Sequence, residues 1–161
     1  MKIIDSDRID ALVADAKTAP RRRVHLNLHA DPAEPINRLV IALEPDTYVR
    51  PHRHCDKFEV FVLIAGRCRL LTFDDVGTVE RQVEMGEGAA RVAEFPPGCW
   101  HSLVVLDAGT VVMEIKPGPY VPTAGADFAA WAPPEGGDEA AACRDWLRTE
   151  AVPGARWQPP A

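Results

Sequence analysis

The sequence lacks the signatures of several large protein classes. It contains no CxxC pair, because Cys55, Cys68, Cys99 and Cys143 are scattered along the chain, and this spacing argues against a zinc ribbon or a disulfide framework. No apolar run approaches the ~20 residues that a membrane-spanning helix needs, and the N-terminus lacks the apolar core of a signal peptide. We therefore expect a cytoplasmic protein that has no membrane partner.

An excess of positive charge is also absent. Lys and Arg together number 18 against 24 Asp and Glu, which gives a formal net charge of -6. Domains that bind nucleic acid usually carry a basic face, so nucleic acid is not an expected partner. The 161 residues suffice for one domain with a sizeable core.

The expected single domain, residues 1–161, has three parts: an N-terminal helix with a basic segment over 1–23, a barrel over 24–116, and a tail rich in Pro, Gly and Ala over 117–161. An amphipathic helix is predicted over 6–18, because apolar residues recur at i, i+3, i+4 and i+7 from Ile9. Ser6 or Asp7 can cap this helix. A short second helix is predicted over 138–149 in the tail.

Short apolar runs separated by turn signals fill the middle of the chain. Strands are predicted over 37–43, 58–64, 68–73, 101–106 and 110–115. Many short strands at this spacing indicate a sandwich or a barrel. No helical periodicity interrupts them, which argues against a doubly wound α/β fold. Trp131 and Trp157 are expected to hold the tail on the barrel.

The most informative stretch runs from residue 51 to residue 59. Side chains alternate along a strand, so His52 and His54 point to one face and supply half of a metal site. Glu59 lies at an odd offset from His54 and would face the other way on one continuous strand. It can join the histidines only if the chain turns between residues 55 and 58, where the sequence is polar.

A fourth candidate ligand lies far away in sequence. His101 follows a turn that contains Pro96, Pro97 and Gly98, and it opens a predicted strand. Imidazole and carboxylate ligands suit divalent transition metals. We therefore predict one metal ion held by His52, His54, Glu59 and His101, with zinc, iron, manganese and nickel as candidates for its identity.

Two motifs in the sequence resemble those of the cupin superfamily. The first is matched by His52-x-His54-x4-Glu59-x6-Gly66, and the centre of the second by Pro96-x-Gly98-x2-His101. The resemblance implies an all-β fold, the cupin double-stranded β-helix or jelly-roll barrel, whose three matching histidines and glutamate bind the metal. The sequence departs from the usual motifs at Asp46, Ala90 and Val105, which concern turns and packing rather than ligands.

A narrower resemblance covers most of the chain, from the first helix to about residue 135. It is carried by Asn27-Leu28-His29, Tyr48-Val49-Arg50-Pro51-His52-Arg53-His54, Phe73-Asp74-Asp75-x-Gly77, Glu114-Ile115-Lys116-x-Gly118-Pro119-Tyr120 and Trp131-Ala132-Pro133. These segments are similar to the WbuC family of cupin metalloproteins. That family is associated with bacterial O-antigen and lipopolysaccharide gene clusters, so the resemblance implies a polysaccharide-related role without a defined reaction.

Strand alternation suggests which residues surround the metal site. If the strand before it is continuous, Tyr48 and Arg50 share the face of His52 and His54, and Arg50 could clamp a carboxylate or phosphate. A bulge would instead turn Arg50 away. These residues, together with Glu114 and Asn27, are the candidate substrate-binding groups.

The hairpin predicted over 101–116 adds further candidates. A two-residue loop at its tip would place His101 opposite Lys116, with Glu114 and Lys116 at the barrel mouth. A three-residue loop would place Met113 and Ile115 there instead. Lys116, Tyr120 and His29 are the candidate acid–base residues. A structural histidine satisfied by hydrogen bonds is the alternative for His29.

The strand over 58–64 is apolar on both faces. Val60, Val62 and Ile64 need a cover, which the N-terminal helix or a second subunit would supply. We therefore expect a homodimer.

Three functional hypotheses follow from a metal site in a small barrel. The first is an enzyme acting on a sugar or small polar acid, for which the family resemblance favours an isomerase or epimerase over a dioxygenase. The second is a non-catalytic protein that binds a sugar or nucleotide-sugar. The third is a structural metal in an interaction module. Open coordination positions favour the first two, and a closed tetrahedral site favours the third.

Overall fold

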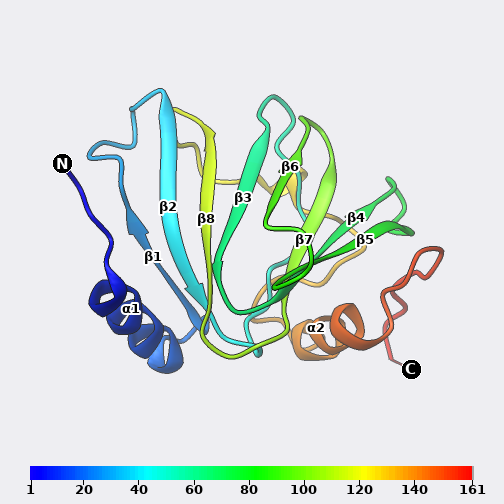
Figure 1. Cartoon of the computed structure of the whole chain (residues 1–161). Coiled ribbons are helices and arrows are strands. Elements are labelled where there is room, and N and C mark those ends of the chain that lie inside the picture. The colour runs from blue at the N-terminus through cyan, green and yellow to red at the C-terminus, as the bar shows by residue number, and fades with distance from the viewer. Residues whose placement is uncertain (161) are drawn as a thin grey trace.

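The computed structural model describes residues 1–160 and shows two antiparallel β-sheets packed face to face (Figure 1). The larger sheet has the strand order β1-β2-β8-β3-β6 and the smaller sheet the order β5-β4-β7. The strands are β1 (Arg23–Asn27), β2 (Ile36–Leu43), β3 (Glu59–Ala65), β4 (Cys68–Phe73), β5 (Val79–Met85), β6 (Val92–Phe95), β7 (Trp100–Val105) and β8 (Thr110–Pro117).

Helices cover the two outer faces of this sandwich. Helix α1 (Ser6–Thr18) lies against the larger sheet, and α2 (Ala140–Thr149) lies at the opposite end of the molecule against β7 of the smaller sheet (Figure 1). A short 3-10 turn, η1 (Gly125–Asp127), lies between β8 and α2. Within residues 1–160, neither α-helix combines the length and the apolar character of a membrane span.

The five predicted strands are all present, and three further strands were not predicted. The missed strands are β1, β5 and β6, and each lies at an edge of its sheet. An edge strand packs against one neighbour and needs fewer buried apolar residues. In β6 only Phe95 is buried, and in β5 only Val79 and Met85 are. The apolar pattern of these strands is therefore weak.

The space between the sheets is filled by apolar side chains from both. Phe61 and Leu63 on β3 point into it and meet Leu70 of β4 and Leu103 of β7. Residues from β7 are buried on both faces, because Val104 packs outward against the tail while Leu103 packs inward. All six residues of β7 are accordingly buried, although the strand includes the polar residues His101 and Ser102.

The predicted helix over 6–18 is confirmed with the same bounds. Its buried residues Leu12 and Ala16 pack on Val40 and Val111 of the larger sheet. The predicted caps were wrong. Asp5 is the N-cap, and its carboxylate accepts a hydrogen bond from a backbone N–H three residues on, at 3.0 Å.

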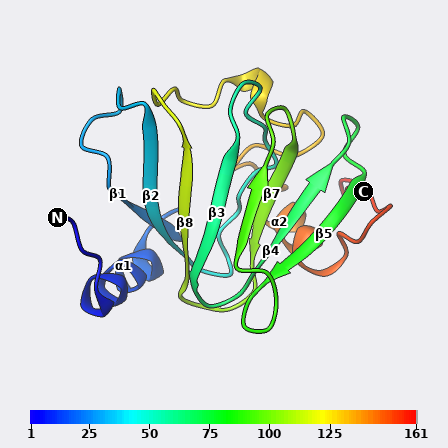
Figure 2. The same ribbon diagram turned by 45° about the horizontal axis from the view of Figure 1, so that its top comes forward.

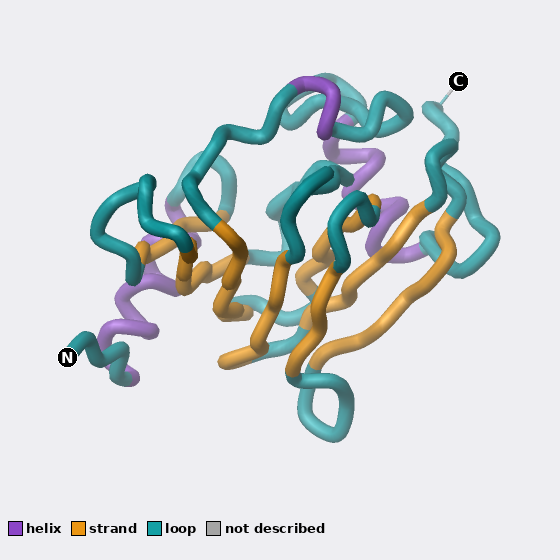
Figure 3. The backbone as a smooth tube through the Cα atoms, turned by 90° about the horizontal axis from the view of Figure 1, so that it is seen from above, coloured by secondary structure: helices purple, strands orange, loops and turns teal. Residues whose placement is uncertain are grey.

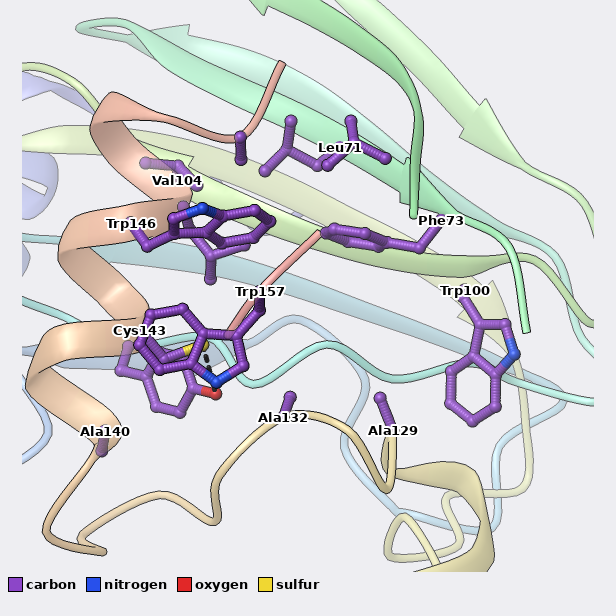
Figure 4. Close-up of a cluster of buried hydrophobic side chains, with 14 residues drawn as sticks. Leu71, Phe73, Trp100, Val104, Ala129, Ala132, Ala140, Cys143, Trp146 and Trp157 are labelled. Atoms are coloured by element: carbon purple, nitrogen blue, oxygen red, sulfur yellow. Dashed lines mark hydrogen bonds between the residues drawn. The ribbon is translucent and has the colours of Figure 1, made fainter. Parts of the chain in front are cut away.

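The tail packs on the outer face of the smaller sheet (Figure 4). Trp146 of α2 and Trp157 lie together, with ring centroids 5.9 Å apart, and Trp131 meets Phe73 of β4 at 4.9 Å. Cys143 is fully buried among them. Both predicted tryptophan anchors therefore lie in this second core.

The predicted hairpin over 101–116 was wrong. β7 pairs with β4 in the smaller sheet, whereas β8 pairs with β2 and β3 in the larger one. The loop between them crosses from one sheet to the other. Thr110 begins β8 fully buried, and its hydroxyl donates to the carbonyl groups of Arg67 and Asp107. Lys116 therefore lies opposite Asn37 of β2 and not opposite His101.

Replacing Leu12 with Ala should destabilise the fold by about 2–5 kcal/mol, because it removes buried methyl groups between α1 and the sheet. Chemical denaturation followed by circular dichroism measures this loss. Asp10→Ala, at an exposed position of the same helix, is the matched control and should change stability by less than about 0.5 kcal/mol. Equal effects of the two substitutions would show that α1 does not pack as described.

Candidate metal centre

Two of the predicted ligands are brought together by backbone pairing. His52 forms an isolated antiparallel bridge with His101, the second residue of β7, through N–O hydrogen bonds of 3.0 and 2.8 Å. Residues paired in this way point to the same face of a sheet. The two imidazole rings accordingly lie with centroids 4.5 Å apart, facing the larger sheet.

The third and fourth ligands complete the cluster from either side of a turn. The chain bends at Cys55 and Asp56 and then enters β3 at Glu59, which is the turn that strand parity required. Glu59 Oε2 lies 2.8 Å from His101 Nε2, and Glu59 Oε1 lies 3.4 Å from His54 Nε2. One ligand atom from each of His52, His54, Glu59 and His101 lies within 4.8 Å of the others.

Backbone carbonyl groups orient two of the imidazoles. Nδ1 of His52 contacts the carbonyl of Arg50 at 2.9 Å, and Nδ1 of His101 contacts the carbonyl of Cys99 at 2.9 Å. A hydrogen bond of this kind places the ring proton on Nδ1 and leaves Nε2 available as a metal ligand. The Phe95 ring stacks on His101 at 4.3 Å and limits its rotation further.

Burial and neighbouring charges set the protonation states of the cluster. Burial and the adjacent His101 lower the pKa of His52 to about 3, so this ring is neutral at physiological pH. Burial alone would raise the pKa of Glu59, but the adjacent imidazoles of His101 and His54 and the Lys116 ammonium hold it well below its usual range. A neutral imidazole and an ionised carboxylate are the forms that bind a metal.

The residues present fit one divalent metal ion. His54 Nε2 is buried and has no hydrogen-bond partner among residues 1–160. Buried polar atoms are rarely left unpaired, so a missing partner at this position needs an explanation. A metal ion would supply it, since three imidazole nitrogens and one carboxylate oxygen are a donor set for Zn²⁺, Fe²⁺, Mn²⁺ or Ni²⁺.

A lysine and a second glutamate lie beside the cluster. Lys116 Nζ lies 3.1 Å from Glu59 Oε1 and 2.6 Å from Glu114 Oε1. Burial and the Glu59 carboxylate raise the pKa of Glu114 to about 8. The pKa of Lys116 is also raised: burial alone would lower it, but the two carboxylates outweigh that effect. Both residues therefore face the interior, but they do so from β8 paired with β2 and β3 and not from the predicted hairpin.

Two cavities adjoin the cluster. The inner cavity, of about 120 Å³, contains His52, His54 and Glu59, and its apolar wall includes Leu103 and Val112. The mouth cavity, of about 370 Å³, opens beside His54 and is lined by residues 118–124. Figures 2 and 3 show this segment crossing one end of the two sheets. Lys116 lines both cavities.

Three other predicted residues gather in a side cavity of about 240 Å³. Asn27, His29 and Tyr120 line it together with Lys116. His29 is 7% exposed, and its Nδ1 accepts a hydrogen bond from the backbone N–H of Arg38 at 3.0 Å. His29 therefore combines both alternatives that the sequence left open, because it is held by a structural hydrogen bond and also lines a cavity.

Tyr48 and Arg50 lie on the other side of the smaller sheet, which corrects the prediction that they share the face of the histidines. The Tyr48 hydroxyl donates to the carbonyl of Pro133 at 3.0 Å. Arg50 donates to the carbonyl groups of Ala129 and Ala132 at 2.9 and 3.1 Å. The alternation breaks near Pro51, because Val49 and His52 both line the inner cavity.

Asn37 was not predicted as a site residue. It is 1% exposed on β2, lies opposite Lys116, and lines both the mouth cavity and the side cavity. Its signal in the sequence is a polar residue on the otherwise apolar inward face of β2, which also carries Leu39, Ile41 and Leu43. That signal becomes readable only once the pairing of β2 with β8 is known.

Comparisons with known proteins relate this geometry to a family and a fold. A family model described as "Domain of unknown function (DUF6016)" matches residues 4–85. No curated protein matches the chain.

Solved structures resemble the chain at low sequence identity. KdgF from Halomonas sp. is 12% identical with a TM-score of 0.51, covering 65% of this chain and 85% of that one. TT1209 from Thermus thermophilus is 18% identical with a TM-score of 0.51, covering 74% and 98%. A recombinant oxalate oxidase in complex with glycolate is 14% identical with a TM-score of 0.50, covering 65% and 56%. The shared fold is the cupin jelly roll.

Lys116→Met should destabilise the chelator-treated protein by about 3–5 kcal/mol, because it leaves Glu59 and Glu114 facing each other without their shared cation. Urea denaturation measures this loss. Adding Glu114→Gln to the same variant should restore part of the stability, since one carboxylate is removed. Lys17→Met, at an exposed position of α1, is the control. If the control destabilises as strongly, the buried ion network is not the cause.

Proposed function

The chain belongs to the family described as a domain of unknown function (DUF6016), and we propose that it is a cupin metalloprotein that binds one divalent transition-metal ion through His52, His54, Glu59 and His101. The observation that carries this proposal is the buried His54 Nε2, which makes no hydrogen bond within the described residues and lies beside three other ligand atoms, the nearest carboxylate oxygen being Glu59 Oε1 at 3.4 Å. A bound ion would pair all four groups at once.

The proposed activity is metal-dependent chemistry on a sugar or a small polar acid, of the isomerase or epimerase kind. When bound, the ion would polarise a carbonyl or hydroxyl group of the substrate. The chain itself places two groups that can carry a proton, Lys116 and Glu114, beside the metal ligand Glu59. The pKa of Glu114 is raised to about 8. A group that titrates near neutral pH is suited to general acid–base catalysis.

The surroundings of the cluster support a small ligand. Phe61, Leu103 and Val112 form an apolar wall that restricts water around the metal ligands. The mouth cavity gives access from one end of the barrel beside His54 and Lys116. Tyr120 and His29, which line the adjoining side cavity, remain the further acid–base candidates. A ligand that entered by the mouth would meet Lys116 before the metal.

A role in O-antigen or lipopolysaccharide metabolism comes from the resemblance to the WbuC family and stays a prediction. A homodimer also stays a prediction. Ile64 packs with α1, while Val60 and Val62 of β3 are half-buried on the outer face of the larger sheet. These two side chains are where a second subunit would add contacts.

Elemental analysis of protein purified without chelator or nickel resin should find about one divalent transition-metal ion per chain. The double substitution His52→Ala plus His101→Ala should abolish this content, because it removes half of the ligand set. His25→Ala is the control, since His25 is exposed on β1 and lies outside the cluster. Unchanged metal content in the double variant would refute the assignment.

A ligand-accessible metal should respond to a small hydroxy acid, whereas a closed structural metal should not. In cobalt(II)-substituted protein, we expect glycolate to change the visible absorption spectrum, because added oxygen ligands alter the cobalt coordination. The same titration with Lys116→Met should show weaker binding by about tenfold, since the Glu59 and Glu114 carboxylates then lose their shared cation and repel the glycolate anion. A spectrum that stays constant at saturating glycolate would favour a structural metal.

A further inference from the structure

Asn37 carries an unexplained feature of this structure. Its side chain is 1% exposed, and neither Nδ2 nor Oδ1 has a hydrogen-bond partner among residues 1–160. A primary amide offers two donors and one acceptor, and leaving both ends unpaired in the interior costs free energy. An apolar side chain of similar shape would avoid this cost. The amide at this position therefore needs a partner that the protein itself does not supply.

The position of Asn37 connects it to the candidate metal centre. β2 and β8 lie side by side (Figure 1), and their register places Asn37 opposite Lys116, whose ammonium contacts Glu59. Asn37, Lys116 and Tyr120 line both the mouth cavity and the side cavity. These three residues form the boundary where the two cavities meet. A molecule that extends from the mouth into the side cavity would pass the Asn37 amide.

The lining of the side cavity indicates the chemistry of such a molecule. Its polar groups besides Lys116 are two amides, two imidazoles and a phenol, supplied by Asn27, Asn37, His25, His29 and Tyr120. Each of these groups can both donate and accept hydrogen bonds. A hydroxyl group has the same double capacity, so a ligand with several hydroxyl groups would match this lining.

Charge argues against a phosphorylated ligand in the side cavity. Among its described lining residues, Lys116 is the only Lys or Arg. Its ammonium is already paired with Glu59 and Glu114. Phosphate recognition usually uses free cations or backbone N–H groups at a helix N-terminus. The side cavity offers hydrogen-bonding capacity without uncompensated positive charge.

We propose that the Asn37 side-chain amide is a ligand-binding group that pairs with hydroxyl groups of a neutral polyhydroxy compound, of the sugar or polyol class, lodged in the side cavity. This inference deepens the proposed function, on which it rests for the idea that the same ligand reaches the metal cluster. It assigns the side cavity to the hydroxyl-bearing part of that ligand. It also disfavours a nucleotide-sugar, whose diphosphate would find no free cation there.

The test uses a matched pair of variants and glucose, sorbitol and glucose 6-phosphate as probes. In ¹H–¹⁵N spectra of the full chain, glucose or sorbitol should shift the Asn37 side-chain NH₂ signals, which Asn37→Leu identifies by their loss. Asn37→Leu should weaken the binding of that probe at least about tenfold.

Glucose 6-phosphate should bind at least about tenfold more weakly than the neutral probe. Gln82→Leu, on β5 of the smaller sheet, is the control and should leave binding unchanged.

Stability separates a ligand-binding amide from a structural one. Asn37→Leu should keep or raise the melting temperature of the ligand-free protein, because it removes a buried amide that has no protein partner. A lower melting temperature with unchanged affinity for the neutral probes would overturn the proposal and assign Asn37 a structural role. Neutral probes that leave the Asn37 NH₂ signals unmoved at saturating concentration would also overturn it.

The metal content of the same samples keeps this inference distinct from the proposed function. If wild-type protein holds no metal but Asn37-dependent sugar binding persists, the proposed function fails and the sugar site stands. If wild-type protein holds one metal ion and no neutral probe depends on Asn37, the sugar site fails and the metal assignment stands. Repeating the titration on His52→Ala plus His101→Ala shows whether the sugar site needs the metal ligands.

Discussion

The structure depends on how the buried carboxylate of Glu59 is compensated. Glu59 is 2% exposed, and an ionised carboxylate in such a place is costly unless it is paired. Its partners come from three segments, as His101 belongs to β7, His54 to the linker before β3, and Lys116 to β8. Both sheets must therefore meet at this point. A fold that separated them would leave a charge buried without compensation.

The remaining layers hold this meeting point in place. Helix α1 covers the outer face of the larger sheet through Leu12 and Ala16, while the tail covers the smaller sheet through Trp146 and Trp157. With both outer faces packed, the polar groups of the interior collect at one end of the barrel. The mouth and side cavities open there, beside Lys116. The same packing that stabilises the fold thus leaves one polar, accessible end.

Local pattern and the cupin motifs were sufficient to predict which four candidate ligands cluster and insufficient for their neighbours. His52, His54, Glu59 and His101 could be predicted because the parity of a strand and two turns act over a few residues. Arg50 could not be placed in the same way, since the alternation breaks near Pro51 and sends its side chain toward the tail. When the alternation of a strand breaks once, every residue on the far side of the break is assigned to the wrong face of the sheet.

Long-range pairing explains the other differences. Glu114 and Lys116 were expected to face inward, and they do, but from β8 in the larger sheet. Alternation alone guarantees that two residues at i and i+2 share a face, whichever strand they pair with. Asn37 was missed because its role depends on lying opposite Lys116. The strands β1, β5 and β6 were missed because they bury few side chains.

The central claim is that four protein groups, from β3, β7 and the linker before β3, hold one metal ion. X-ray absorption spectroscopy of the metal-loaded protein tests it directly, because the spectrum reports which atoms surround the ion. We expect nitrogen and oxygen neighbours only, with the multiple-scattering pattern of three imidazole rings from His52, His54 and His101. A sulfur neighbour from a cysteine, or a spectrum with one imidazole or none, would contradict the account.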